Sequence, residues 1–80
     1  EFGVIMPGTD QAAAQRLMEM ALDEFCDMVY RTPEGNFTAS FSCGVSDSRR
    51  DGTVKGLTGD ADQALYLAKN AGRNRVMTAR

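Results

Sequence analysis

Histidine and tryptophan are absent from this chain of 80 residues, and cysteine and proline occur only twice each. Without histidine, neither a histidine-based catalytic triad nor a histidine-containing zinc site can form. Two cysteines are too few for a disulfide scaffold, so a reducing cytosol is the expected compartment. The chain also lacks a run of 18 apolar residues and a signal peptide, so its sequence indicates neither a membrane span nor export.

The composition is that of an ordinary globular domain, because 42% hydrophobic and 25% charged residues argue against disorder. The net charge of −2 conceals an asymmetry. Residues 1–48 hold two basic and eight acidic side chains (−6), whereas residues 49–80 hold seven basic and three acidic ones (+4). Nucleic-acid binders are usually basic overall, so the basic end favours a small phosphorylated ligand, although charge runs are also common on solvated surfaces. No P-loop or dinucleotide-binding glycine motif occurs.

The first third of the chain predicts a strand followed by a helix. The apolar run Phe2–Met6 ends at a Pro-Gly turn, as expected of a buried strand. Thr9 or Asp10 is placed to cap a helix that runs to about Tyr30. Its apolar residues recur at helical spacing and predict an inward stripe, namely Ala14, Leu17, Met18, Ala21, Phe25, Met28 and Val29.

The rest of the chain predicts strand, helix and strand. After a turn at Pro33–Asn36, apolar residues alternate with small or polar ones over Phe37–Val45, which predicts one strand. A charged loop at residues 47–52 leads to a helix that begins somewhere between residues 53 and 60, and residues 76–79 form a last short strand. The pattern gives an α/β domain with helices packed on a sheet, and leaves open whether the sheet is parallel.

The last third carries the most specific pattern. Ala61, Ala64, Leu65 and Ala68 recur at i, i+3, i+4 and i+7, so a narrow face of mostly small side chains can lie flat on a sheet. Gly72 stands where a left-handed residue would end the helix. Lys69 and Arg73 then emerge close together, a pair of cations suited to holding a polyphosphate. This stretch, AD-x-ALY-x-AK-x-x-GRNRV, closely resembles the C-terminal signature of diguanylate cyclase (GGDEF) domains.

Two further segments resemble the same family in register. Residues 1–10 resemble the end of the GGDEF motif with its following strand and turn, and residues 42–46 resemble the family's Ser-x-Gly strand. The resemblance implies that residues 1–80 are the C-terminal portion of a single GGDEF domain. It also implies a central, mostly antiparallel sheet flanked by helices, as in the palm-like nucleotidyl cyclases, present here as a β-α-β-α-β fragment. We expect such a fragment to leave sheet edges and helix faces uncovered and to dimerise or exchange strands.

The resemblance implies a bacterial signalling enzyme of the cytoplasm that condenses two GTP molecules into cyclic di-GMP and releases pyrophosphate. Two Mg²⁺ (or Mn²⁺) ions per active site would serve the complete domain, since a metal pair stabilises both the attacking and the leaving oxygens in phosphoryl transfer. Each active site would hold one GTP, so a homodimer is needed. No contact with nucleic acid or membrane is expected, and the 80-residue piece by itself is expected to be inactive.

Three residues match the family's site. Glu1 corresponds to the fourth position of the motif, a site-facing acid that is a possible metal ligand, whereas the main metal ligands would lie upstream; alternatively it is a frayed terminus. Lys69 and Arg73 match the basic residues that contact the terminal phosphates of GTP. Their alternative role is to complement the negative end of the helix dipole, worth about 0.3–1 kcal/mol each.

Other residues are expected to be structural. Asn74 and Arg75 would fix the turn after the helix, and Gly44 would provide the small residue needed where a helix crosses the strand. Cys26 and Cys43 fall on the predicted buried faces, where a small apolar role is expected. Beside the cyclase, two other functions stay open: a degenerate GGDEF domain that binds GTP or a partner without turnover, and an α/β interaction domain without nucleotide chemistry.

Overall fold

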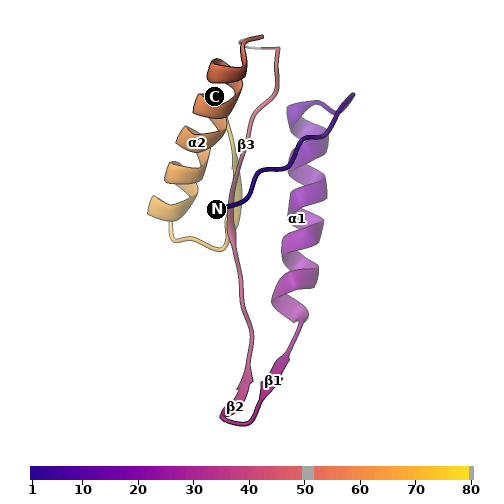
Figure 1. The fold of residues 1–80 in the computed structure, drawn as a ribbon, viewed down its shortest axis with the longest axis vertical. Coiled ribbons are helices and arrows are strands. Elements are labelled where there is room, and N and C mark those ends of the chain that lie inside the picture. The colour runs from indigo at the N-terminus through magenta and orange to yellow at the C-terminus, as the bar shows by residue number, and fades with distance from the viewer. Residues whose placement is uncertain (50–51, 80) are drawn as a thin grey trace.

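The computed structural model describes residues 1–49 and 52–79 and has three layers. Figure 1 shows helices α1 and α2 on either side of a central pair of strands, with a β-hairpin projecting below them. This projection makes the molecule elongated, 48 Å by 25 Å by 17 Å. The elements in chain order are α1 (Gln11–Asp27), β1 (Tyr30–Thr32), β2 (Gly35–Phe37), β3 (Ser42–Val45), α2 (Val54–Asn70) and β4 (Arg75–Thr78).

Helix α1 begins where the sequence predicts. Asp10 is its N-cap, and the Asp10 carboxylate accepts a hydrogen bond of 2.8 Å from the Ala13 amide. The helix ends at Asp27 rather than at about Tyr30. The reason is that Tyr30 opens the hairpin, where it pairs with Phe37 and stacks on its ring at 5.1 Å.

The buried face of α1 differs in part from the predicted stripe. Ala14 is buried and Met18 packs against the core as expected, but Leu22, outside the predicted stripe, is buried as well. Leu17 and Met28, both expected to face inward, are 50% and 54% exposed. Ala14, Met18 and Leu22 follow one i, i+4 row, which is wide enough to cover only the two strands that lie beneath it.

The central strands β3 and β4 are parallel, with Cys43 opposite Val76 and Val45 opposite Thr78. In the described residues the antiparallel pairing is confined to the β1–β2 hairpin, so the expected mostly antiparallel central sheet is not present here. The connection explains the direction, because a strand–helix–strand crossover through α2 returns the chain parallel to the strand it left.

The predicted continuous strand Phe37–Val45 is instead two strands. Its first residue belongs to β2 and its last four form β3, while residues 38–41 have no strand partner in the described chain. The two ends pair with different neighbours, β1 and β4, and both neighbours are short. The predicted alternation still holds, since Cys43 and Val45 contact the α1 side and Gly44 contacts α2.

The expected N-terminal strand over Phe2–Met6 does not form. Phe2 is fully exposed and Ile5 is 90% exposed, whereas Met6 packs against the core. A buried strand needs a neighbour to take up its backbone hydrogen bonds, and no strand of the described chain pairs with this segment.

Helix α2 lies directly on β3. Ala64 and Ala68 are 1% and 0% exposed, so the predicted face of small side chains is confirmed. A Cβ atom on Gly44 would overlap the Ala61 carbonyl oxygen and the Leu65 amide nitrogen. The helix begins at Val54 behind its N-cap Thr53, within the predicted window.

Two other outcomes complete the comparison with the sequence. Within the expected charged loop of residues 47–52, residues 50 and 51 lie outside the described chain. Neither of the two helices described has the length and hydrophobicity that a membrane crossing requires.

Candidate phosphate-binding corner

The corner between α2 and β4 begins with a Schellman-type stop. The Arg73 amide donates to the Ala68 carbonyl at 3.0 Å, and Gly72 has a φ of 121°. The prediction that Gly72 is the left-handed residue after the helix is confirmed. The chain is thereby turned sharply back toward β4, and the bond to Ala68 ties the Arg73 backbone to the last turn of α2.

The turn then continues through two further left-handed residues. Arg73 has a φ of 63° and Asn74 a φ of 49°, a conformation that costs a non-glycine residue about 1–2 kcal/mol. Two side-chain bonds hold it. The Arg75 Nε–H donates to the Arg73 carbonyl at 3.1 Å, and the Cys26 thiol donates to Asn74 Oδ1 at 3.4 Å. These contacts agree with the prediction that Asn74 and Arg75 fix the turn.

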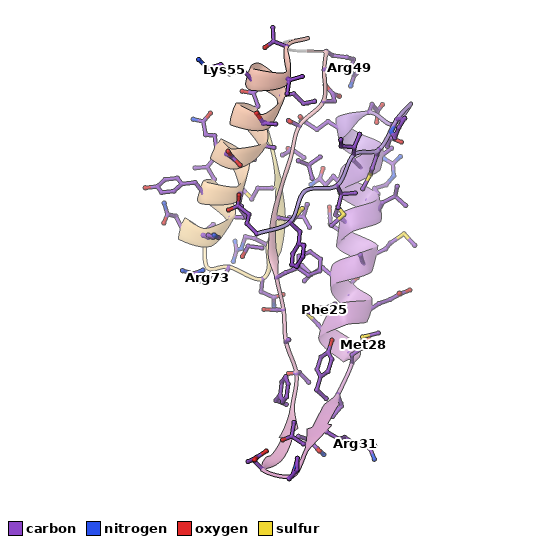
Figure 2. The ribbon with its side chains drawn as sticks, viewed as in Figure 1. Phe25, Met28, Arg31, Arg49, Lys55 and Arg73 are labelled. Atoms are coloured by element: carbon purple, nitrogen blue, oxygen red, sulfur yellow. The ribbon has the colours of Figure 1, made fainter. Side chains whose placement is uncertain are left out.

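Lys69 and Arg73 flank this turn with their side chains exposed. Lys69 lies in the last turn of α2, and Figure 2 places Arg73 just beyond the end of that helix. Both ion pairs of the described chain belong to Arg49, so neither cation is matched with a carboxylate there. Because the C-terminal end of a helix carries partial negative charge, only the side-chain charges can attract an anion to this corner.

Glu1 is not joined to this corner. It is exposed at the N-terminus, and no hydrogen bond or ion pair of the described residues connects it to Lys69 or Arg73. Along the long axis of the molecule the N-terminus lies level with the C-terminal turn of α2 (Figure 1). The structure therefore brings the two cations to one corner and leaves Glu1 exposed and separate from them.

The metal ions implied by the resemblance find no donor set here. No three His, Cys, Asp or Glu residues of the described chain are grouped so as to hold a metal ion. Glu1 would be a single carboxylate ligand, and hard divalent ions take several oxygen ligands. The described residues by themselves therefore do not supply the ligands of a metal pair.

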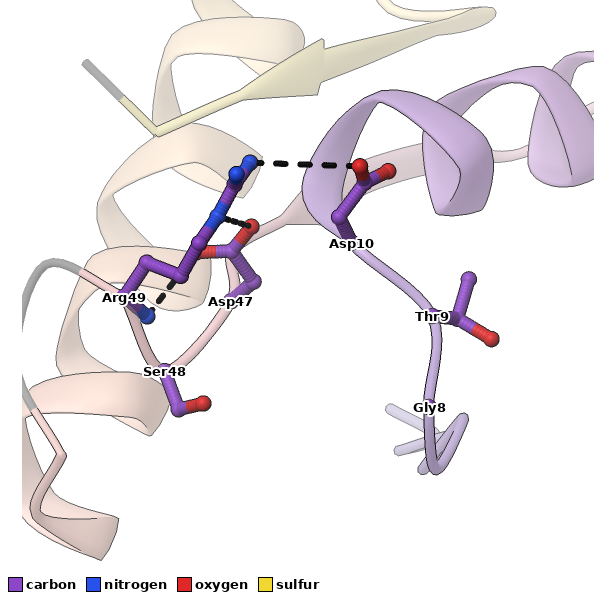
Figure 3. Close-up of a pocket in the computed structure, with 6 residues that line it drawn as sticks. All are labelled: Gly8, Thr9, Asp10, Asp47, Ser48 and Arg49. Carbon is purple, nitrogen blue, oxygen red and sulfur yellow. Dashed lines mark hydrogen bonds and ion pairs between the residues drawn. The ribbon is translucent and has the colours of Figure 1, made fainter.

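A second polar cluster lies at the far end of α2, around a recess of about 290 Å³ lined by Gly8, Thr9, Asp10, Asp47, Ser48 and Arg49. Figure 3 shows Arg49 reaching both carboxylates there: its Nε is 3.2 Å from Asp47 and an Nη is 4.0 Å from Asp10. Asp47 also accepts a bond of 2.8 Å from the Gln11 amide.

The contacts around this recess stabilise the fold. Hydrogen bonds donated by the backbone amides of Gln11 and Arg49, and then the Arg49 side chain, lower the pKa of Asp47. The carboxylates of Asp10 and Asp47 already accept hydrogen bonds from backbone amides in the first turn of α1. This helix end therefore does not attract a further anion. The sequence offers only an indirect signal for this cluster, an acid two residues after the end of a strand and a second acid at a helix N-cap.

Comparison with known proteins identifies the family of the chain. The chain is 29% identical over 77 residues to the uncharacterized protein YtrP of Bacillus subtilis (strain 168), an alignment that covers 96% of this chain and 13% of YtrP. The chain thus spans only a small part of that relative's length. No solved structure matches this one. Residues 1–75 match the family described as diguanylate cyclase, GGDEF domain. Because that match covers nearly the whole chain, the protein belongs to the GGDEF family.

Proposed function

We propose that this chain is the C-terminal portion of a diguanylate cyclase domain and that its corner between α2 and β4 holds the terminal phosphates of GTP. The observation that carries the proposal is the placement of Lys69 in the last turn of α2 and Arg73 in the left-handed turn that follows it, without a carboxylate partner in the described chain. Family membership supports a nucleotide ligand, and in the sequence resemblance both residues correspond to the basic residues that contact the terminal phosphates of GTP.

The chemistry proposed for the complete domain is the condensation of two GTP molecules into cyclic di-GMP. The 3′-hydroxyl of each GTP attacks the α-phosphate of the other, the α–β phosphoanhydride bond breaks, and pyrophosphate leaves. Negative charge builds up on the leaving β- and γ-phosphates, and Lys69 and Arg73 would stabilise it there. Each domain would bind one GTP, so two domains must meet as a homodimer in the cytoplasm, where GTP is available.

The metal ions belong to the same proposal. Mg²⁺ or Mn²⁺ would supply charge neutralisation and activation of the attacking hydroxyl. Glu1 is the residue of this chain proposed to face that site, with the remaining ligands supplied by upstream elements of the domain.

The test uses the whole protein incubated with GTP and Mg²⁺, with pyrophosphate and cyclic di-GMP as the products measured. Lys69→Ala and Arg73→Ala are each expected to lower turnover about 100-fold, as the loss of one charge-stabilising donor does in other enzymes. Arg31→Ala is the matched control, because it removes an exposed arginine on the hairpin, remote from the corner (Figure 2). Melting temperatures close to that of the unmodified protein show that the variants fold.

Other outcomes separate the alternatives. Full activity in Lys69→Ala, or its failure to fold, refutes the assignment of the phosphate site. GTP binding without either product favours the second candidate, a degenerate GGDEF domain that acts as a regulatory module. Thermal stability that is indifferent to both GTP and Mg²⁺ favours an interaction domain without nucleotide chemistry.

A further inference from the structure

Three consecutive residues at the phosphate corner have positive φ values, Gly72 at 121°, Arg73 at 63° and Asn74 at 49°. Glycine adopts this region freely and asparagine tolerates it, but arginine adopts it only at a cost. A left-handed run of this kind persists only where the surroundings impose it. The contacts that hold the Arg73 backbone matter most, because the backbone conformation sets the direction of the Arg73 guanidinium.

Arg75, two residues after Arg73, contacts the Arg73 backbone directly. Its Nε–H donates to the Arg73 carbonyl oxygen at 3.1 Å. A Cβ atom on Gly72 would come within 2.8 Å of an Arg75 Nη and 3.6 Å of its Cζ. The Arg75 side chain is therefore folded back over the turn, where it lies against Gly72 and is hydrogen-bonded to Arg73.

The rest of Arg75 is well anchored for this role. It is the first residue of β4, where it is paired with Ser42 of β3. In the part of the chain described, no carboxylate forms an ion pair with it. Arg73 is thus held from two sides, at its amide by the Ala68 carbonyl of α2 and at its carbonyl by Arg75 of β4.

We propose that Arg75 is a positioning residue that acts through Arg73. By fixing the Arg73 carbonyl, it sets the direction of the Arg73 guanidinium beside Lys69, so that the two cations meet the terminal phosphates of one bound nucleotide. This inference rests on the proposed function of the corner. It assigns Arg75 no contact with the nucleotide itself.

A double-mutant cycle on the whole protein tests the proposal, with GTP and GMP as probes and affinity measured by calorimetry. Arg75→Met keeps most of the apolar stem and removes the Nε–H. It is expected to weaken GTP binding about tenfold, a coupling typical of residues in direct contact. GMP lacks the β- and γ-phosphates, so its binding is expected to be unchanged. Added to Arg73→Met, Arg75→Met is expected to cause no further loss.

The outcomes are distinguishable. An equal loss of GTP affinity in the presence and absence of Arg73 would mean that Arg75 does not act through it, and no loss in Arg75→Met would also overturn the inference. Arg31→Met is the control for removing one positive charge. If Arg73→Met itself leaves GTP binding unchanged, the proposed function fails, whereas failure of Arg75→Met alone leaves that function standing.

A second measurement covers the case in which Arg75→Met does not fold. In the unmodified protein, NMR can measure a scalar coupling between the Arg75 Nε nitrogen and the Arg73 carbonyl carbon. This coupling is transmitted through the hydrogen bond from the Nε–H to the carbonyl oxygen. Its observation in the GTP-bound state is the expected result. Rapid exchange of that proton with solvent, without a coupling, would overturn the proposal.

Discussion

Gly44 is the residue at which α2 and the central strands come closest. Its missing side chain leaves room for the α2 backbone, because an added Cβ would overlap atoms of Ala61 and Leu65 and lie 2.9 Å from the Ala64 carbonyl carbon. Backbone atoms cannot turn aside as the end of a flexible side chain can. The helix and strand would have to separate together, and with them the Ala64 contact at the centre of the interface.

We therefore expect Gly44→Ala to lower the free energy of unfolding by about 1–3 kcal/mol, measured by urea denaturation followed by circular dichroism. Gly59→Ala is the matched control, since Gly59 is exposed in α2 and an added Cβ there meets no atom within 4 Å. That change is expected to raise stability by about 1 kcal/mol, because alanine favours the helix. An equal effect of both substitutions would contradict the close packing at Gly44.

Cys43 offers a second measurement on the same strand. Burial raises the pKa of its thiol above the ordinary value of 9.0, so less thiolate is present at a given pH. In Cys26→Ser, where Cys43 is the remaining cysteine, we expect iodoacetamide to react more slowly with the folded chain than with the chain in urea at the same pH. The midpoint of the rate against pH should lie above 9.0. Identical rates in both states would show that Cys43 is open to solvent.

The arrangement of the candidate site could be predicted in part from the sequence. The placement of Lys69 and Arg73 beside Gly72 follows from helix spacing and from glycine's conformational freedom, both of which are local properties. The bond from Arg75 to the Arg73 carbonyl, and the one from Cys26 to Asn74, were not predictable. Each depends on where a turn with unusual φ values sends a side chain, and the second also depends on how α1 packs against that turn.

At the level of elements, the start of α1 is fastened to the end of β3. Asp47 lies two residues beyond the end of β3 and accepts hydrogen bonds from the Gln11 backbone amide and from Arg49. Gln11 in turn donates its side-chain amide to the Ala79 carbonyl at 2.8 Å, next to the end of β4. One carboxylate and one amide thus join the helix to both central strands.

This fastening predicts a dependence of stability on pH. The pKa of Asp47 is lowered on folding, chiefly by the Gln11 amide, so its contribution is present above its ordinary value of 3.8 and is lost as the pH falls through the folded pKa. Asp47→Asn should therefore be less stable than the unmodified protein at neutral pH, and the difference should shrink below pH 3.8. Urea denaturation at a series of pH values measures it. A difference that stays constant into that acid range would refute the role of the charged form.

Which elements sequence could predict follows from the range of the interactions that make them. The cap at Asp10, predicted as Thr9 or Asp10, and the stop at Gly72 involve neighbours within one helical turn and were predicted, whereas the N-cap Thr53 was bracketed only by a window of residues 53–60. The phase of the buried face of α1 and the fate of the Phe2–Met6 segment depend on the width of a sheet assembled from distant residues. For that reason the prediction of the buried face was wrong in part, and the predicted strand over Phe2–Met6 is not present in this chain.

At the scale of the whole molecule, apolar surface is incompletely covered. Among the described residues the buried hydrophobic ones are Ala14, Leu22, Val45, Ala64, Ala68 and Val76, and none is a large side chain that is fully buried. Phe2, Ile5, Met20 and Val54 are among the large hydrophobic side chains left exposed. A core this small gives modest stability, in line with the sequence-based expectation of uncovered faces. Under the proposed function, a larger sheet in the complete domain would cover this exposed apolar surface.

The last prediction concerns that larger sheet. We propose that Phe2–Met6 becomes a paired strand when the chain stands behind the upstream elements of its family. The amides of Val4 and Ile5 should then exchange rapidly with solvent in the 80-residue chain, where the segment is exposed, and be protected in the complete domain. Hydrogen exchange followed by NMR measures both states. The Val45 region serves as the internal control, since the Val45 carbonyl accepts the Ala79 amide at 2.8 Å, and Ala79 should be protected in both. Equal, rapid exchange at Ile5 in both proteins would mean that this segment is not a strand of the domain.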